Sequence, residues 1–133
     1  MSDYTITATM NQPCADTVAA VRTALADQGF GVLTEIDLKA TLKAKLDVDI
    51  EPQIILGACR PALAYEAIQA DMAIAAVLPC NVVVRSVNET TTVVEAIDPD
   101  AMMGIAANDA LHAVAADAKQ RLTAALASLS TES

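Results

Sequence analysis

The chain has 133 residues, of which 54% are hydrophobic, and a formal net charge of −9. This length is typical of one domain with a single core. The acidic balance, 17 acidic against 8 basic side chains, disfavours nucleic acid and anionic membranes as partners, because both repel negative charge. The sequence has no bilayer-spanning apolar run and no signal peptide at its start. We therefore expect a cytoplasmic protein whose three cysteines are reduced.

The first part of the chain alternates between strand and helix patterns. Residues 4–10 alternate polar and apolar side chains, which predicts a half-buried strand. Pro13 then begins a helix with apolar residues at helical spacing, and Gly29 is placed to end it in a left-handed conformation. Residues 30–38 alternate again and predict a second strand. The lysine-rich segment 39–49 predicts a short helix or an irregular loop.

The middle of the chain favours three more strands. The apolar run 52–59 predicts a buried strand, and Gly57 near its end indicates a bulge or the close approach of another segment. Good helix formers fill 60–71. We expect a strand over 74–87 in which Pro79 marks a bulge, an edge or the strand's entry. A further strand is expected over 90–98.

The last segments complete a two-layer pattern. Residues 98–104 predict a loop that carries two methionines, and Asn108 is placed to cap a long amphipathic helix that follows it. Residues 130–133 should form a frayed tail of the single domain 1–133. This order of elements predicts an α+β fold, a two-layer sandwich in which a largely antiparallel sheet has its helices packed on one face.

Several segments together resemble a known family. The segments "ALADQGFGVLTEIDLKATLKAKL", "ILGACRPALAYEAIQAD", "VLPCNVVV" and "AIDP" are similar to the family filed as "domain of unknown function 302". The resemblance implies a TATA-binding-protein-like α+β architecture, often dimeric, with no established activity. Members of that family often carry Asn after the first cysteine, where this chain has Arg60, so a role that rests on that amide does not carry over.

Cys59 and Cys80 are the most specific candidate site. Each lies beside a proline, one at the end of a predicted strand and one at the start of the next. If those strands pair antiparallel, the two thiols meet at one end of the sheet, where they could form a disulfide or share a soft metal. Cys59 also precedes a helix N-terminus, which would lower its pKa, and Arg60 would stabilise its thiolate. The alternative is that both are small buried hydrophobic residues.

A metal site needs three or four ligands, and the sequence offers few. His112, the only histidine, follows apolar Leu111 and should face away from the core, while Cys14 lies outside the cysteine motif. We therefore predict no metal site, and the sequence names no cofactor.

The remaining candidates are acidic or sulfur-containing. Glu35 and Asp37 lie two apart on one strand and could serve acid–base chemistry, although a solvated sheet face explains them more simply. Asp98, before a proline, indicates a turn first and a functional carboxylate second. Met102 and its neighbour Met103 could line an apolar pocket or bind copper through their thioethers, although contact with a partner or simple packing is the more common role of such a pair.

Taken together, these patterns predict a small binding module, in the form of a homodimer, that engages a ligand or thiol-reactive species near Cys59 and Cys80. Arg60 would supply charge there, and the loop with Asp98 and Met102 could act as a lid. Two alternatives stay open: a redox or sulfur-handling enzyme that uses the two thiols, and a purely structural or assembly protein.

Overall fold

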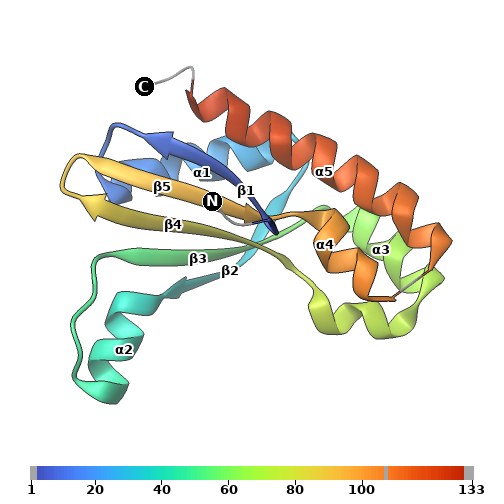
Figure 1. Ribbon diagram of the computed structural model, residues 1–133, viewed down its shortest axis with the longest axis horizontal. Coiled ribbons are helices and arrows are strands. Elements are labelled where there is room, and N and C mark those ends of the chain that lie inside the picture. The colour runs from blue at the N-terminus through green and yellow to red at the C-terminus, as the bar shows by residue number, and fades with distance from the viewer. Residues whose placement is uncertain (1–2, 107, 131–133) are drawn as a thin grey trace.

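A five-stranded antiparallel sheet forms the centre of the molecule (Figure 1), as seen in a computed structural model that describes residues 3–106 and 108–130. The strand order is β1-β5-β4-β3-β2, and all four neighbouring pairs run antiparallel. This confirms the predicted α+β class. The strands are β1 (Thr5–Met10), β2 (Gly31–Asp37), β3 (Gln53–Cys59), β4 (Cys80–Asn88) and β5 (Thr91–Ile97).

Two helices, α1 (Cys14–Asp27) and α5 (Asp109–Ser130), cover one face of the sheet. As predicted, Gly29 follows α1 with a φ of +84°, and the Phe30 amide donates to the Leu25 carbonyl oxygen at 3.0 Å, which closes the helix end. Asn108 caps α5 by accepting from the Ala110 amide at 2.9 Å. Helix α5 includes Ser130; the rest of the expected tail, 131–133, lies outside the described residues.

The core between this face and the two helices is aliphatic. Its fully buried side chains come from β1, β3, β4 and β5 on one side and from α1 and α5 on the other, and they include Met10, Leu25, Leu56, Val84 and Leu122. A second cluster of buried residues packs the C-terminal half of the fold at one end of the sheet. Among the described residues, none of the helices combines the length and the apolar character needed to cross a membrane.

Three short helices gather at that end: α3 (Pro61–Ala70), the 3-10 helix η1 (Met72–Val77) and α4 (Pro99–Met103). The expected strand over 74–87 was wrong in its first part, because 74–77 belong to η1 and the strand begins at Cys80. Asp71 starts η1 by accepting from the Ala73 amide, a local cap that competes with strand pairing. Pro79 marks the strand's entry, as one of the three predicted alternatives had it.

The segment 98–104 is also more ordered than expected. It forms α4, followed by the one-turn 3-10 helix η2 (Gly104–Ala106), rather than a loop. Asp98 accepts a hydrogen bond from the Asp100 amide at 2.9 Å, and Pro99 occupies the first helical position. The same Asp-Pro pair therefore begins a helix instead of a turn, because both residues favour a helix N-terminus.

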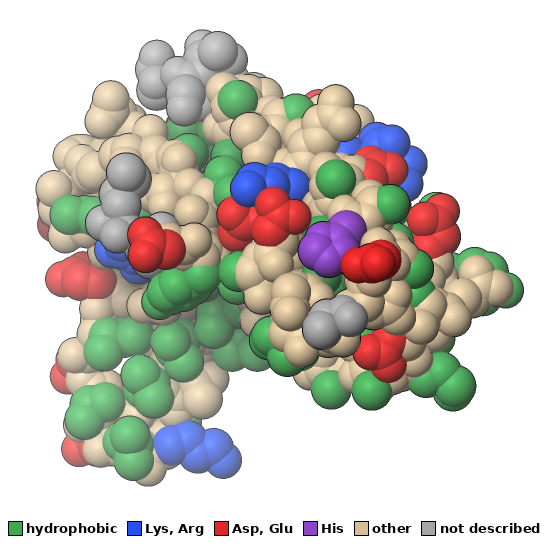
Figure 2. Space-filling model, turned by 45° about the vertical axis from the view of Figure 1, so that its right-hand side comes forward, with side chains coloured by type: hydrophobic (Ala, Val, Ile, Leu, Met, Phe, Trp, Pro, Cys, Tyr) green, Lys and Arg blue, Asp and Glu red, His purple; other side chains and the backbone are tan. Residues whose placement is uncertain are grey.

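Helix α2 (Leu38–Leu46) stands apart from the two layers. It continues from β2 beyond the end of the sheet and has no buried residue. Asp37 caps it by accepting from the Ala40 amide at 2.9 Å. Figure 2 shows hydrophobic side chains over this lobe, at the lower left, and in the hollow between the lobe and the body.

Candidate functional site

The structure brings Cys59 and Cys80 together. Cys59 ends β3, Cys80 begins β4, and the register places Ala58 directly opposite Cys80. Both cysteines line one small cavity of about 30 Å³ behind Pro79, together with Arg60 and Met103. A space of that size holds a water molecule or two but no organic ligand. Both are free thiols; Cys80 is buried and Cys59 is half-buried.

Burial controls the chemistry of these thiols. Desolvation raises the pKa of Cys80 to about 11, with a smaller contribution from the nearby Cys59, and desolvation also raises the pKa of Cys59. The lowered pKa that we expected for Cys59 was therefore wrong, because the loss of hydration outweighs the field of the helix N-terminus. Since the thiolate is the reactive form, this pair is poorly suited to nucleophilic chemistry near neutral pH.

Arg60 lies beside the thiols, at the N-cap of α3. Its side chain runs across Gly29: a Cβ at that glycine would lie 3.0 Å from the Arg60 Nε. This Nε is buried and has no hydrogen-bond partner among the described residues. The guanidinium thus contributes to the wall of the thiol cavity.

The other polar candidates hold the fold together. Asp98 caps α4, and its carboxylate also pairs with Lys119 Nζ at 3.1 Å. Glu35 forms an ion pair with Arg22 of α1, and Asp37 caps α2. Each of these carboxylates has a structural partner, so none of them is poised as a free acid or base.

The described residues contain no cluster of three or more His, Cys, Asp or Glu side chains that could hold a metal ion. His112 is exposed on α5, as its position after Leu111 predicted. Cys14 is buried on the sheet's helical face, where its Sγ lies 3.7 Å from the Val84 carbonyl oxygen.

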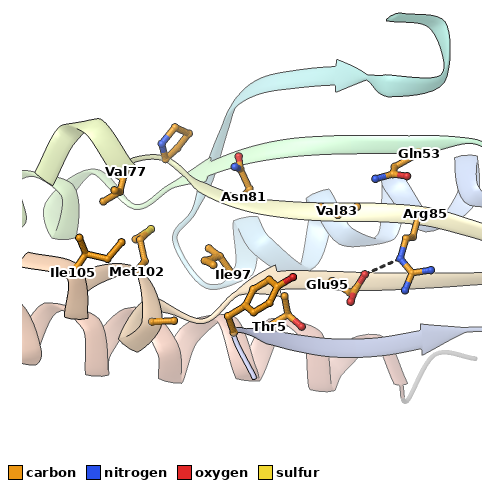
Figure 3. Close-up of a pocket in the computed structure, with 13 residues that line it drawn as sticks. Thr5, Gln53, Val77, Asn81, Val83, Arg85, Glu95, Ile97, Met102 and Ile105 are labelled. Atoms are coloured by element: carbon orange, nitrogen blue, oxygen red, sulfur yellow. Dashed lines mark hydrogen bonds and ion pairs between the residues drawn. The ribbon is translucent and has the colours of Figure 1, made fainter. Parts of the chain in front are cut away.

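A larger cavity lies on the opposite, uncovered face of the sheet (Figure 3). It encloses about 810 Å³ against β4 and β5 and is bounded at one end by η1, α4 and η2. We call it the sheet-face pocket. Its lining residues are Tyr4, Thr5, Gln53, Val77, Pro79, Asn81, Val83, Arg85, Glu95, Ile97, Ala101, Met102 and Ile105.

The two methionines of the predicted loop divide between the two cavities. Met102 lines the sheet-face pocket, Met103 lines the thiol cavity, and both are buried. Pro79 lines both spaces and so forms part of the wall between them. Of the predicted site residues, Cys59, Arg60 and Cys80 therefore meet in one cavity, Met102 lies in the other, and Asp98 lies in neither.

Sequence reasoning missed the polar residues of the sheet-face pocket. Arg85 Nε donates to Glu95 Oε1 at 2.7 Å across β4 and β5. The available signal was the alternation of Asn81, Val83 and Arg85 along one strand, which places all three on one face. Only the position of the helices shows that this face is the uncovered one.

Comparison with known proteins gives a family and a related structure. The sequence profile described as "Domain of unknown function DUF302" matches residues 6–129. The chain is similar to the crystal structure of an uncharacterized conserved protein DUF302 from Bacillus stearothermophilus, with 28% sequence identity and a TM-score of 0.86. That match covers 95% of this chain and 98% of the other. The search of curated proteins finds no match. The chain, with its open sheet face and its two neighbouring thiols, belongs to the DUF302 family.

Proposed function

We propose that the protein is a small-molecule-binding domain whose ligand occupies the sheet-face pocket. The observation that carries this proposal is the cavity of about 810 Å³ on the uncovered sheet face. Ligand sites in proteins typically enclose about 300–1,000 Å³, with mostly apolar walls and a few polar groups. The pocket combines apolar side chains such as Ile97 and Met102 with the Arg85–Glu95 pair.

The cysteine pair takes a supporting position in this proposal. The sheet-face pocket and the thiol cavity share Pro79 as a lining residue, so a ligand in the pocket is near Cys59 and Cys80. The thiol cavity itself is too small to hold the ligand. A redox or sulfur-handling role would use the two thiols in their shared cavity, and the raised pKa of both disfavours it. Titration with a disulfide reagent at pH 7 tests that role: two fast-reacting thiols would favour the enzyme over the binding domain.

The test of ligand binding uses Nile red, a neutral and planar dye that fluoresces in apolar surroundings. We expect saturable binding of one dye per chain. Val83→Trp should weaken it, because Val83 lies in the pocket lining and the larger ring takes up part of the space. The matched control is Thr9→Trp, which adds the same ring to the same sheet face, opposite Val93, where neither residue lines the pocket. Equal dye binding by the two variants would overturn the proposal.

We also propose that the domain forms a homodimer through the lobe of α2. A nine-residue helix is marginal in water without tertiary packing, and α2 has no buried residue. Strand β2 exposes Leu33 and Ile36, and the lobe (residues 38–50) exposes Leu46 and Val48, with 65%, 45%, 66% and 42% of their surface accessible. Apolar patches of this kind are typical of protein interfaces, and a second copy would bury them.

Sedimentation velocity tests the dimer. We expect a mass near twice the 13.8 kDa of the chain for the wild type and a monomer for Leu46→Glu. Ala44→Glu places the same charge on the same helix two residues away and should stay dimeric. A wild-type monomer at micromolar concentration would contradict the dimer and leave the binding proposal untouched. If no ligand or dye binds and only the dimer is found, the assembly role remains.

A cytoplasmic location is the last part of the proposal. It is supported by the free thiols Cys14, Cys59 and Cys80, since reducing compartments keep thiols in this form.

A further inference from the structure

The sheet-face pocket is polar at one end and apolar at the other. Val77, Met102 and Ile105 lie together at the end formed by the short helices, whereas Arg85, Glu95 and Gln53 lie along the strands away from it (Figure 3). A molecule that fills this space must itself have an apolar part and a polar part. This inference rests on the function proposed above and concerns the chemistry of the ligand's polar part.

Among the described residues, the charged groups in the pocket lining are Arg85 and Glu95, and they neutralise each other. Arg85 lies directly opposite Val93 and Glu95 directly opposite Val83, so both side chains project from the uncovered face of the sheet. Arg85 Nε donates to Glu95 Oε1 at 2.7 Å, and the Arg85 and Glu95 side chains are 42% and 23% exposed. A bound carboxylate would have to compete with Glu95 for Arg85, and a bound ammonium would have to compete with Arg85 for Glu95. Otherwise the bound ion would have no opposite charge beside it. Both situations are unfavourable in a partly desolvated site.

Two uncharged amides also line the pocket, beside the Tyr4 hydroxyl and the guanidinium N–H groups of Arg85 that Glu95 does not use. The register places Gln53 directly opposite Arg85, and Asn81 directly opposite Gly57. Both line the pocket, and no hydrogen bond to either side chain occurs within the described part of the chain. A primary amide offers both donors and an acceptor without a charge, so these groups complement a head group that also donates and accepts.

From these observations we infer that the ligand is an uncharged amphiphile. Its head, an amide or a similar group with both a donor and an acceptor, faces Gln53 and the Arg85–Glu95 pair, which lie side by side. Its apolar tail lies toward Met102 and Ile105. The ion pair determines the specificity. Because each of its charges already has an opposite charge beside it, the pocket should have a lower affinity for ligands with a charged head.

Three compounds with the same six-carbon tail test this inference: hexanamide, hexanoate and hexylammonium, titrated by NMR or calorimetry at pH 7. We expect hexanamide to bind at least about tenfold more tightly than either ion. Lengthening the tail by one methylene should raise the affinity about three- to fourfold while space remains at the apolar end.

Two variants should redirect the preference in opposite senses. Glu95→Gln leaves the Arg85 charge uncompensated, so hexanoate should become the best of the three ligands. Arg85→Gln leaves the Glu95 carboxylate uncompensated, so hexylammonium should become the best. Glu35→Gln removes one partner of the Arg22–Glu35 pair outside the pocket and should leave the preference for hexanamide unchanged. A loss of folding, monitored by circular dichroism, cannot imitate two opposite changes of preference.

The outcomes separate this inference from the proposed function. If the wild type prefers hexanoate or hexylammonium, or binds Nile red but no six-carbon ligand, the uncharged head is wrong and the pocket remains a binding site. The same holds if the two variants keep the wild-type preference. If neither Nile red nor any of the three compounds binds, the proposed function and this inference fall together.

Discussion

Pro79 closes over Gly57 of the neighbouring strand so tightly that a Cβ at Gly57 would lie 2.9 Å from the proline Cγ and 2.2 Å from Thr34 Oγ1. Pro79 and Thr34 therefore leave no room for a side chain at residue 57. The neighbouring strand β2 has a register shift between Val32 and Thr34, beside Gly57. The wall between the two cavities depends on this contact, because Pro79 lines both.

Gly57→Ala should accordingly destabilise the protein. Overpacking at a closely packed site typically lowers the free energy of unfolding by about 1–3 kcal/mol, and we expect a value in this range from urea unfolding. Gly104→Ala is the matched control, because a Cβ at Gly104 meets no atom within 4 Å. Equal stability of the two variants would show that the contact with Pro79 is loose.

The thiol of Cys80 should make stability depend on pH in alkaline solution. Its pKa is raised by burial from an ordinary value of 9.0 to about 11, so the folded state holds its proton when the unfolded state has lost it. The stabilisation is complete below about pH 9 and disappears as pH rises through 11. Its full size is about 2–3 kcal/mol.

Urea unfolding at a series of pH values from 8 to 11.5 measures this effect, with Cys80→Ala as the reference that cancels the other titrating groups. The wild type should lose stability relative to Cys80→Ala by up to about 1.4 kcal/mol per pH unit between pH 9 and 11. Parallel curves for the two proteins would mean that the thiol is hydrated.

Asp98 should matter for stability more than for binding. Asp98→Ala removes the cap of α4 and the ion pair with Lys119, and the loss of an N-cap typically costs about 0.5–2 kcal/mol. Asp98→Asn keeps a capping oxygen and should cost less. Thermal unfolding of both variants measures the difference, and a larger loss for Asn than for Ala would contradict the capping role.

Leu122 tests whether α5 covers the sheet as described. It is fully buried in the core beneath the sheet, and replacing a buried leucine by alanine typically costs about 2–5 kcal/mol. Thr123 is the next residue and is exposed. Leu122→Ala should therefore be destabilised by several kcal/mol in urea, whereas Thr123→Ala should stay within about 0.5 kcal/mol of the wild type.

The class of the fold and most of its elements can be predicted from local sequence patterns. Period-two alternation in β1 and helical spacing in α1 and α5 are local consequences of which face of each element is buried. Gly29 and Asn108 marked helix ends because their conformational and capping preferences are also local. The sequence pattern predicts a strand just after Asp71 and a loop at Asp98. In both places the aspartate side chain caps a helix N-terminus, and a helix forms.

The position of the candidate site depends instead on contacts between distant segments of the chain. Whether Asn81, Val83 and Arg85 face water, a helix or a cavity depends on where α1, α5 and the short helices pack, and these are contacts between distant segments. The thiols illustrate the same point: the convergence of Cys59 and Cys80 followed from antiparallel pairing, but their pKa depends on how deeply the assembled fold buries them. Desolvation is a property of the whole surrounding structure, so no local pattern contains it.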